Sequence, residues 1–126
     1  MAVYKLFPTK DTTLYSEFPS MNTGLDEIIE SSTYLSLGTP QVSRYLIQFS
    51  TSEIQSVLDN KVSGSSFSSS LKNSAAVVTS LNLDTQLEFH TISGSWGMGT
   101  GRYGSSPQTT NGASWIWRSY SGSDAW

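Results

Sequence analysis

The sequence contains no cysteine, which excludes disulfide bonds and thiolate metal sites. A small domain without disulfides must be stabilised by a hydrophobic core or by partner subunits. Charged residues make up only 13% of the 126 residues, against roughly 25% in typical soluble domains. Serine, threonine and glycine take their place, a composition typical of sheet proteins that pack against neighbours. We therefore expect a single strand-rich domain.

Basic residues are also scarce. The net charge is −3, and the seven lysines and arginines are scattered singly, so no basic patch favours nucleic-acid binding. No run approaches the roughly 20 apolar residues of a membrane helix. The opening MAVYKLFPTK lacks a charged region followed by an apolar one, so we expect no signal peptide. Low charge without an export signal favours a virion component, which is made in the host cytoplasm and leaves by lysis.

Short runs with strand-like alternation, separated by turn residues, dominate the chain. In the clearest one, SRYLIQF at 43–49, aromatic and aliphatic residues lie on one face and Leu46 lies on the other. We expect both faces of this strand to be partly covered. The serine-rich run 63–70 is expected to be a loop with Phe67 as its one anchor, or else the mobile tip of the domain. Further extended runs are predicted at 3–7, 11–15, 25–30, 33–37 (ending at Gly38 and Pro40), 75–83, 86–92 and 113–118.

One helix is predicted, at about residues 51–59. It begins with a capping box, S-x-x-E, whose first residue is Ser50. The apolar residues Ile54, Val57 and Leu58 then lie on one face. Two turns are too few for a helix to be stable alone, so we expect this helix to dock on the sheet. Together these elements predict an all-β jelly-roll β-sandwich with one short docked helix.

The C-terminal stretch 95–126 holds all four tryptophans and a cluster of glycines. Glycine permits positive φ and close backbone approach, so we expect a shaped loop pinned by large aromatic side chains. Exposed Trp and Tyr rings could stack on sugars, whereas buried ones would hold the loop or an interface. Arginines here could pair with acids of a neighbouring subunit. The candidate interface or ligand-binding residues are Trp96, Arg102, Tyr103, Trp115, Trp117, Arg118 and Trp126.

Catalytic signals are few. His90 is the only histidine, and no serine lies in a G-x-S-x-G elbow. A hydrolase would need two carboxylates about 5 to 9.5 Å apart. Acidic candidates for such a pair are Asp26, Glu27, Glu30, Glu88 and Asp124. The acidic run at 26–30 could bind Ca²⁺, but its spacing fits no EF-hand loop, and a solvated acidic rim is the favoured interpretation. We expect no enzyme and no cofactor, with Ca²⁺ as an alternative.

The order of these pieces resembles the jelly-roll modules known as DNRLRE-type domains, which are similar to carbohydrate-binding modules. The shared pieces are DTTLY at 11–15, NTG at 22–24, RYLIQF at 44–49, the short helix, the run from Ala75, and SW at 95–96 and 114–115. KDTTLYSEFPSMNTGLDEI together with SWGMGTGRY is similar to small virion structural proteins of tailed bacteriophages, including cyanophages.

The resemblance implies a non-enzymatic virion structural protein of the capsid, neck or tail. It would form a homo-oligomer and bind other virion proteins, but neither nucleic acid nor membrane. In that family further strands follow the second SW motif, so residues 1–126 would form a single domain that lacks its C-terminal strands. Such a sheet has an edge that needs a partner. The alternative is a carbohydrate-binding module or host-glycan adhesin that uses the Trp/Gly-rich loop.

Overall fold

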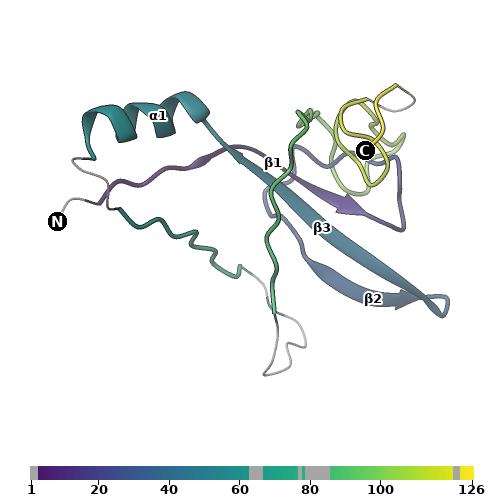
Figure 1. Cartoon of the computed structure of the whole chain (residues 1–126). Helices are drawn as coiled ribbons and strands as arrows, with labels where there is room; N and C mark the ends of the chain where they lie inside the picture. Colours follow the sequence, from purple (N-terminus) through teal and green to yellow (C-terminus); the bar gives the residue numbers. More distant parts are fainter. Residues whose placement is uncertain (1–2, 63–66, 77, 79–85, 121–122) are drawn as a thin grey trace.

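The computed structural model describes residues 3–62, 67–76, 78, 86–120 and 123–126. Its named elements are β1 (Pro8–Tyr15), β2 (Ser32–Ser36), β3 (Thr39–Phe49) and α1 (Thr51–Asn60). The three strands form one antiparallel sheet in the order β1-β3-β2, and α1 continues from the end of β3 (Figure 1). The predicted strands at 11–15, 33–37 and 43–49 and the helix at about 51–59 are confirmed, and so is the strand-rich class.

The core lies on one face of the central strand β3. Leu46 of β3 and Leu14 of β1 are both buried there, because the register places Leu14 opposite Arg44 and Thr12 opposite Leu46. Trp96 and Ala113 of the C-terminal loop pack against these two leucines, with Met98 and Trp115 beside them. The core is small. Its buried apolar residues, among those described, are Leu14, Tyr15, Met21, Leu46, Trp96 and Ala113.

The outer edge of β1 is closed by a side chain. The Thr23 hydroxyl accepts a hydrogen bond from the Thr13 amide (3.1 Å) and donates one to the Thr13 carbonyl (2.8 Å). These are the two backbone groups of Thr13 that point away from β3, and their bonds leave no room for another strand at this position. The loop that follows β1 therefore ends the sheet on this side.

The β2–β3 hairpin contradicts the prediction that Pro40 ends a strand. Its two-residue turn consists of Leu37 and Gly38, both with positive φ (50° and 79°), as in the tight turns that fit the twist of a hairpin. Pro40 lies one position beyond the pair that closes this turn, opposite Leu35. There the proline nitrogen points away from β2, and β1 already ends at Tyr15, so no ladder hydrogen bond is lost.

Several predicted strands are absent. Residues 3–7, 86–92 and 113–118 form no strand, apart from an isolated antiparallel bridge between Trp117 and Ala125. Residues 25–30 contain a turn and a bend instead of an extended run. In the predicted strand 75–83, the structure describes only residues 75, 76 and 78, and these form no strand. The rest of that strand lies outside the described residues, and so do residues 63–66 of the predicted serine-rich loop. Phe67 is 62% exposed, so it is no anchor. Alternation alone makes no strand unless the segment lies along a free strand edge.

The prediction that the helix docks on the sheet is wrong. Ser50 caps α1 as expected, since its hydroxyl accepts a hydrogen bond from the Glu53 amide at 3.2 Å. However, α1 contains no buried residue and projects from the end of β3 (Figure 1). The reason is the connection, which is the single residue Ser50 and allows no return over the sheet. Among the described residues, no helix has the length and apolar character that crossing a membrane requires.

Candidate functional site

One buried asparagine organises the C-terminal loop. The Asn22 amide nitrogen donates hydrogen bonds to the carbonyls of Met98 (2.7 Å) and Ala113 (2.9 Å). Its amide oxygen accepts from the backbone nitrogens of Gly24 (3.3 Å) and Gly101 (2.9 Å). Both donors of the amide and both lone pairs of its oxygen are thus in use. Asn22 therefore ties the loop after β1 to a segment that lies more than 70 residues further along the chain.

Glycine is required where the loop wraps around this asparagine. A Cβ atom at Gly101 would lie 2.0 Å from the Asn22 carbonyl oxygen, and one at Gly99 would lie 2.2 Å from its side-chain oxygen. Gly99 also has φ of 75°, which L-residues adopt only with strain. The sequence pattern indicated the glycines but not Asn22, which looked like an ordinary turn residue. Only its place in the NTG motif singled it out.

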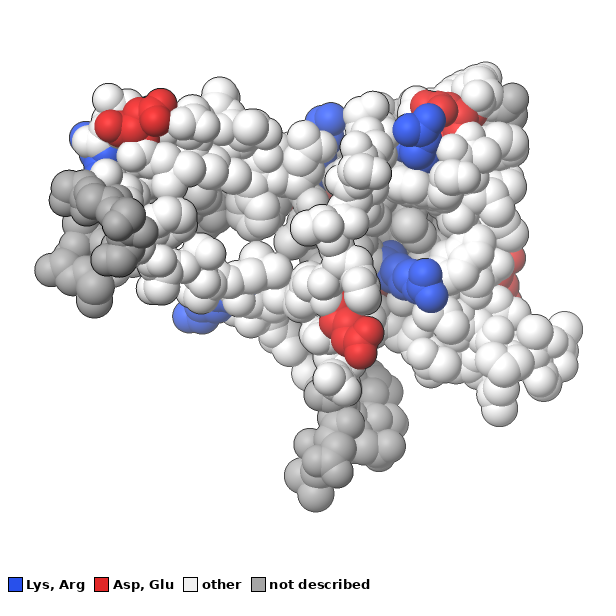
Figure 2. Space-filling model, viewed as in Figure 1, with Lys and Arg blue, Asp and Glu red and all other residues white. Residues whose placement is uncertain are grey.

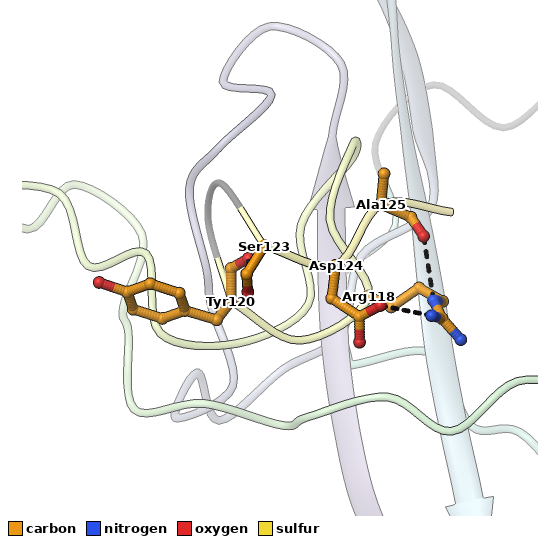
Figure 3. A network of polar contacts seen from close by, with 5 residues as sticks. All are labelled: Arg118, Tyr120, Ser123, Asp124 and Ala125. Atoms are coloured by element: carbon orange, nitrogen blue, oxygen red, sulfur yellow. Dashed lines mark hydrogen bonds and ion pairs between the residues drawn. The ribbon is translucent and has the colours of Figure 1, made fainter.

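The last residues of the chain are held by Arg118 (Figure 3). Its guanidinium forms an ion pair with Asp124 through Nη2 and donates a 3.0 Å hydrogen bond from Nε to the Ala125 carbonyl. The Arg118 amide also donates to the Asp124 carbonyl at 2.7 Å, and its carbonyl accepts from Gly97 at 3.0 Å. The ring of Tyr120 points away from this ion pair (Figure 3). Arg118 therefore pairs within its own chain, and the acid of a neighbouring subunit is not needed to neutralise it.

The four tryptophans differ in how much they expose. Trp96 is buried, Trp115 and Trp117 are half-buried, and Trp126 is 46% exposed. The Trp126 indole nitrogen donates to the Ser114 carbonyl at 2.9 Å, which anchors the ring to the loop. The indole nitrogen of Trp117 is buried without a partner among the described residues. Tryptophan thus mostly supports the loop rather than offering a free face.

A groove of about 1400 Å³ runs along β3 beside this loop. One wall is the segment 86–96, which has no strand partner, and its Phe89 ring packs edge-on against Tyr45 at 6.1 Å. The groove is aromatic, but two cations reach it: Lys10 lies 5.9 Å above the Trp96 ring and Arg44 lies 5.1 Å above the Trp115 ring. The large apolar or aromatic residues that line it are Leu14, Tyr45, Leu46, Ile47, Phe49, Leu71, Leu87, Phe89, Ile92, Trp96, Trp115 and Trp126.

Tyr103 belongs to a second cluster, away from the tryptophans. Its ring is 53% exposed and rests against Tyr15 (5.0 Å between centroids) and Phe18 (5.9 Å). Its backbone amide donates to both carboxylate oxygens of Asp26, at 3.1 and 3.2 Å. The neighbouring Arg102 is exposed. The structure therefore separates Arg102 and Tyr103 from the tryptophans with which the sequence grouped them.

Carboxylates surround this aromatic cluster and perturb its phenols. Burial, followed by the charge of Glu30, raises the pKa of Tyr15, whose hydroxyl donates to Glu30 at 3.2 Å. A hydrogen bond to Glu17 is the main cause that raises the pKa of Tyr34 to about 12. The same bond is the main cause that lowers the pKa of Glu17. The cluster is thus an acidic, partly exposed aromatic surface.

The candidate catalytic groups do not form a recognisable site. His90 lies 3.5 Å from Glu88, and both side chains are largely exposed. In the described part of the chain, no three histidine, aspartate or glutamate side chains gather as a metal site requires. Asp26 and Glu30 instead accept hydrogen bonds from the Tyr103 amide and the Tyr15 hydroxyl. Figure 2 shows the charged side chains dispersed over a largely uncharged face.

Comparisons with protein-family models, curated proteins and solved structures find no match for this chain.

Proposed function

We propose that this chain is a non-enzymatic structural subunit that works by assembling with copies of itself and with other structural proteins. Its proposed setting is the virion of a tailed bacteriophage, as a capsid decoration, neck or tail component. The setting rests on the order of the sequence motifs. The assembly rests on one structural observation, which is the amount of surface that the single chain leaves exposed.

The exposed surface is much larger than that of a compact monomer. The chain exposes 9449 Å², whereas a compact protein of 13.7 kDa exposes about 6,600 Å² by the scaling of surface with mass. The surplus is about 2,900 Å² of polar and apolar surface together. Large apolar side chains contribute to it from the helix, from the segment 86–92 and from the groove. Association would remove this surface from water.

The jelly-roll sandwich is part of the same proposal. The sheet has three strands, and a sandwich needs a second sheet over its apolar face. Segment 86–92 alternates like a strand and lies along the groove without pairing. In the assembly, partner strands or helices would supply the missing layer.

Association of the purified chain tests this proposal. We expect light scattering after size-exclusion chromatography to give a mass that is a multiple of 13.7 kDa and that rises with concentration in the micromolar range. Cooperative unfolding should shift to higher denaturant as the protein concentration rises, because association stabilises the folded chain. A compact, cooperatively folded monomer at every concentration contradicts the proposal.

A glycan-binding role is the second candidate, and the exposed ring of Tyr103 favours it. Aromatic faces stack on sugars, and the carboxylate of Asp26, which accepts hydrogen bonds from the Tyr103 amide, could also accept them from sugar hydroxyls. Binding on a glycan array that Tyr103→Ala abolishes would support this role. Tyr120→Ala is the matched control, since Tyr120 is equally exposed (56%) but lies elsewhere.

A further inference from the structure

Helix α1 carries an apolar face that its own chain covers only in part. Ile54, Val57 and Leu58 lie on one side of the helix, as helical spacing requires, yet no residue of α1 is buried. Ile54 is 37% exposed, and Val57 and Leu58 are half-buried. A ten-residue helix is only marginally stable in water, so it needs packing from another source.

The chain prevents this helix from reaching the groove beside its own β3. β3 ends at Phe49 and α1 begins at Thr51, so Ser50 is the whole connection. Ser50 is extended (φ −67°, ψ 116°) and its hydroxyl caps the helix, which fixes the direction in which α1 leaves the sheet. Reversal of the chain needs a longer loop than one residue. The helix and the groove are therefore complementary but kept apart within one copy.

Their charges also match. The groove carries the cations Lys10 and Arg44 above its tryptophan rings, against a single lining carboxylate, Glu88. The helix carries Glu53 in its first turn and Asp59 in its last, and no basic residue in the last turn. An acidic helix with one apolar face fits an aromatic groove edged with cations, in the manner of other helix-in-groove complexes.

We propose that α1 of one copy lies in the groove of a second copy, and that the exchange is reciprocal in a twofold dimer. This inference rests on the proposed assembly and names its contact. A helix of ten residues is about 15 Å long, a suitable length for a groove of about 1400 Å³. Permanent dimers bury about 2,000–5,000 Å² in total, or about 1,000–2,500 Å² per chain, so the surplus of about 2,900 Å² per chain is more than such an interface needs. Exchange of an identical element is a common route to such dimers.

The first experiment places a charge on the apolar face of the helix. In Ile54→Asp we expect the dissociation constant, measured by sedimentation equilibrium, to rise at least tenfold, because two buried contacts per dimer each acquire a desolvated charge. Ser56→Asp is the matched control: it lies about 200° around the helix from Ile54 and should leave association unchanged. Equal dissociation constants for the two variants overturn the helix exchange.

The second experiment does not depend on the stability of a variant. The chain has no cysteine, so an introduced thiol is the only one. We mix a Val57→Cys chain with a mass-tagged Phe89→Cys chain and add a short bifunctional thiol reagent. A cross-linked heterodimer is expected, whereas Ser56→Cys in place of Val57→Cys should give far less. Equal yields from the two pairs overturn the exchange.

The outcomes separate this inference from the proposed function. If the wild-type chain associates but Ile54→Asp and the Val57–Phe89 cross-link behave like their controls, the assembly stands and the exchange is wrong. If the wild-type chain is a monomer throughout, both are wrong. Loss of association in Ile54→Asp together with the selective cross-link supports both.

Discussion

Replacement of Asn22 by alanine should release the C-terminal loop. The substitution removes all four side-chain hydrogen bonds, three of them fully buried, and leaves the Met98 and Ala113 carbonyls and two glycine amides without this partner. Each buried group left unpaired costs about 1–3 kcal/mol, so we expect a loss of about 4 kcal/mol or more. That is a large part of the roughly 5–15 kcal/mol by which typical domains are stable.

Urea unfolding followed by tryptophan fluorescence measures this loss, since every tryptophan lies in the affected segment. Asn111→Ala is the matched control. Its side chain also bonds to the loop, accepting from the Thr100 amide (3.0 Å) and donating to its hydroxyl (2.8 Å), but both bonds are exposed. We expect that variant to lose about 1 kcal/mol or less. Similar losses for the two asparagines would refute the view that Asn22 organises the loop.

Three further predictions concern single residues. Gly101→Ala should lower the free energy of unfolding several times more than Gly104→Ala does, as measured by urea denaturation. The new Cβ at position 101 would lie 2.0 Å from the backbone carbonyl oxygen of Asn22. The new Cβ at position 104 would meet nothing within 4 Å, so that variant suffers only the strain of φ 73°, about 1 kcal/mol. Glu17→Gln should bring the pKa of Tyr34 down from about 12 towards its ordinary 10 in an absorbance titration. Since the folded pKa of Tyr34 is the higher one, its stabilising contribution is present below pH 10 and is lost as the pH rises from about 10 to 12. Arg118→Ala should lower the free energy of unfolding by about 1 kcal/mol or less, because the ion pair that it removes is partly exposed. The same substitution should speed the removal of the last residues by carboxypeptidase, and an unchanged rate would contradict the anchoring role of Arg118.

The features that were predictable from the sequence are those set by neighbouring residues. The serine cap at Ser50, the apolar spacing after it and the alternation at 43–49 each depend on local backbone geometry, and each appears in the structure. The pairing of β2 with β3 follows from this alternation and from the tight turn at Leu37 and Gly38. Local chemistry specifies these elements without help from the rest of the chain.

The features that were not predictable depend on distant contacts. Segment 86–92 alternates as well as β2 does, but whether it pairs depends on which part of the sheet it lies beside, and it lies along the groove without pairing to a strand. The role of Asn22 requires knowing that residues 98–113 surround it. The separation of Tyr103 from the tryptophans arises in the same way, because the bond of its amide to Asp26 directs it to the other loop. A single sequence does not contain these pairings.

The hydroxyl of Thr23 also limits how such sheets can aggregate. Endless growth by strand addition requires two open edges on every molecule, one to receive and one to donate. On the side of β1 the Thr13 amide and carbonyl are already satisfied by Thr23, while in the described structure β2 pairs only with β3. One threonine side chain therefore blocks the addition of a strand to β1 at the position of Thr13, and continuous growth of the sheet past this residue is disfavoured.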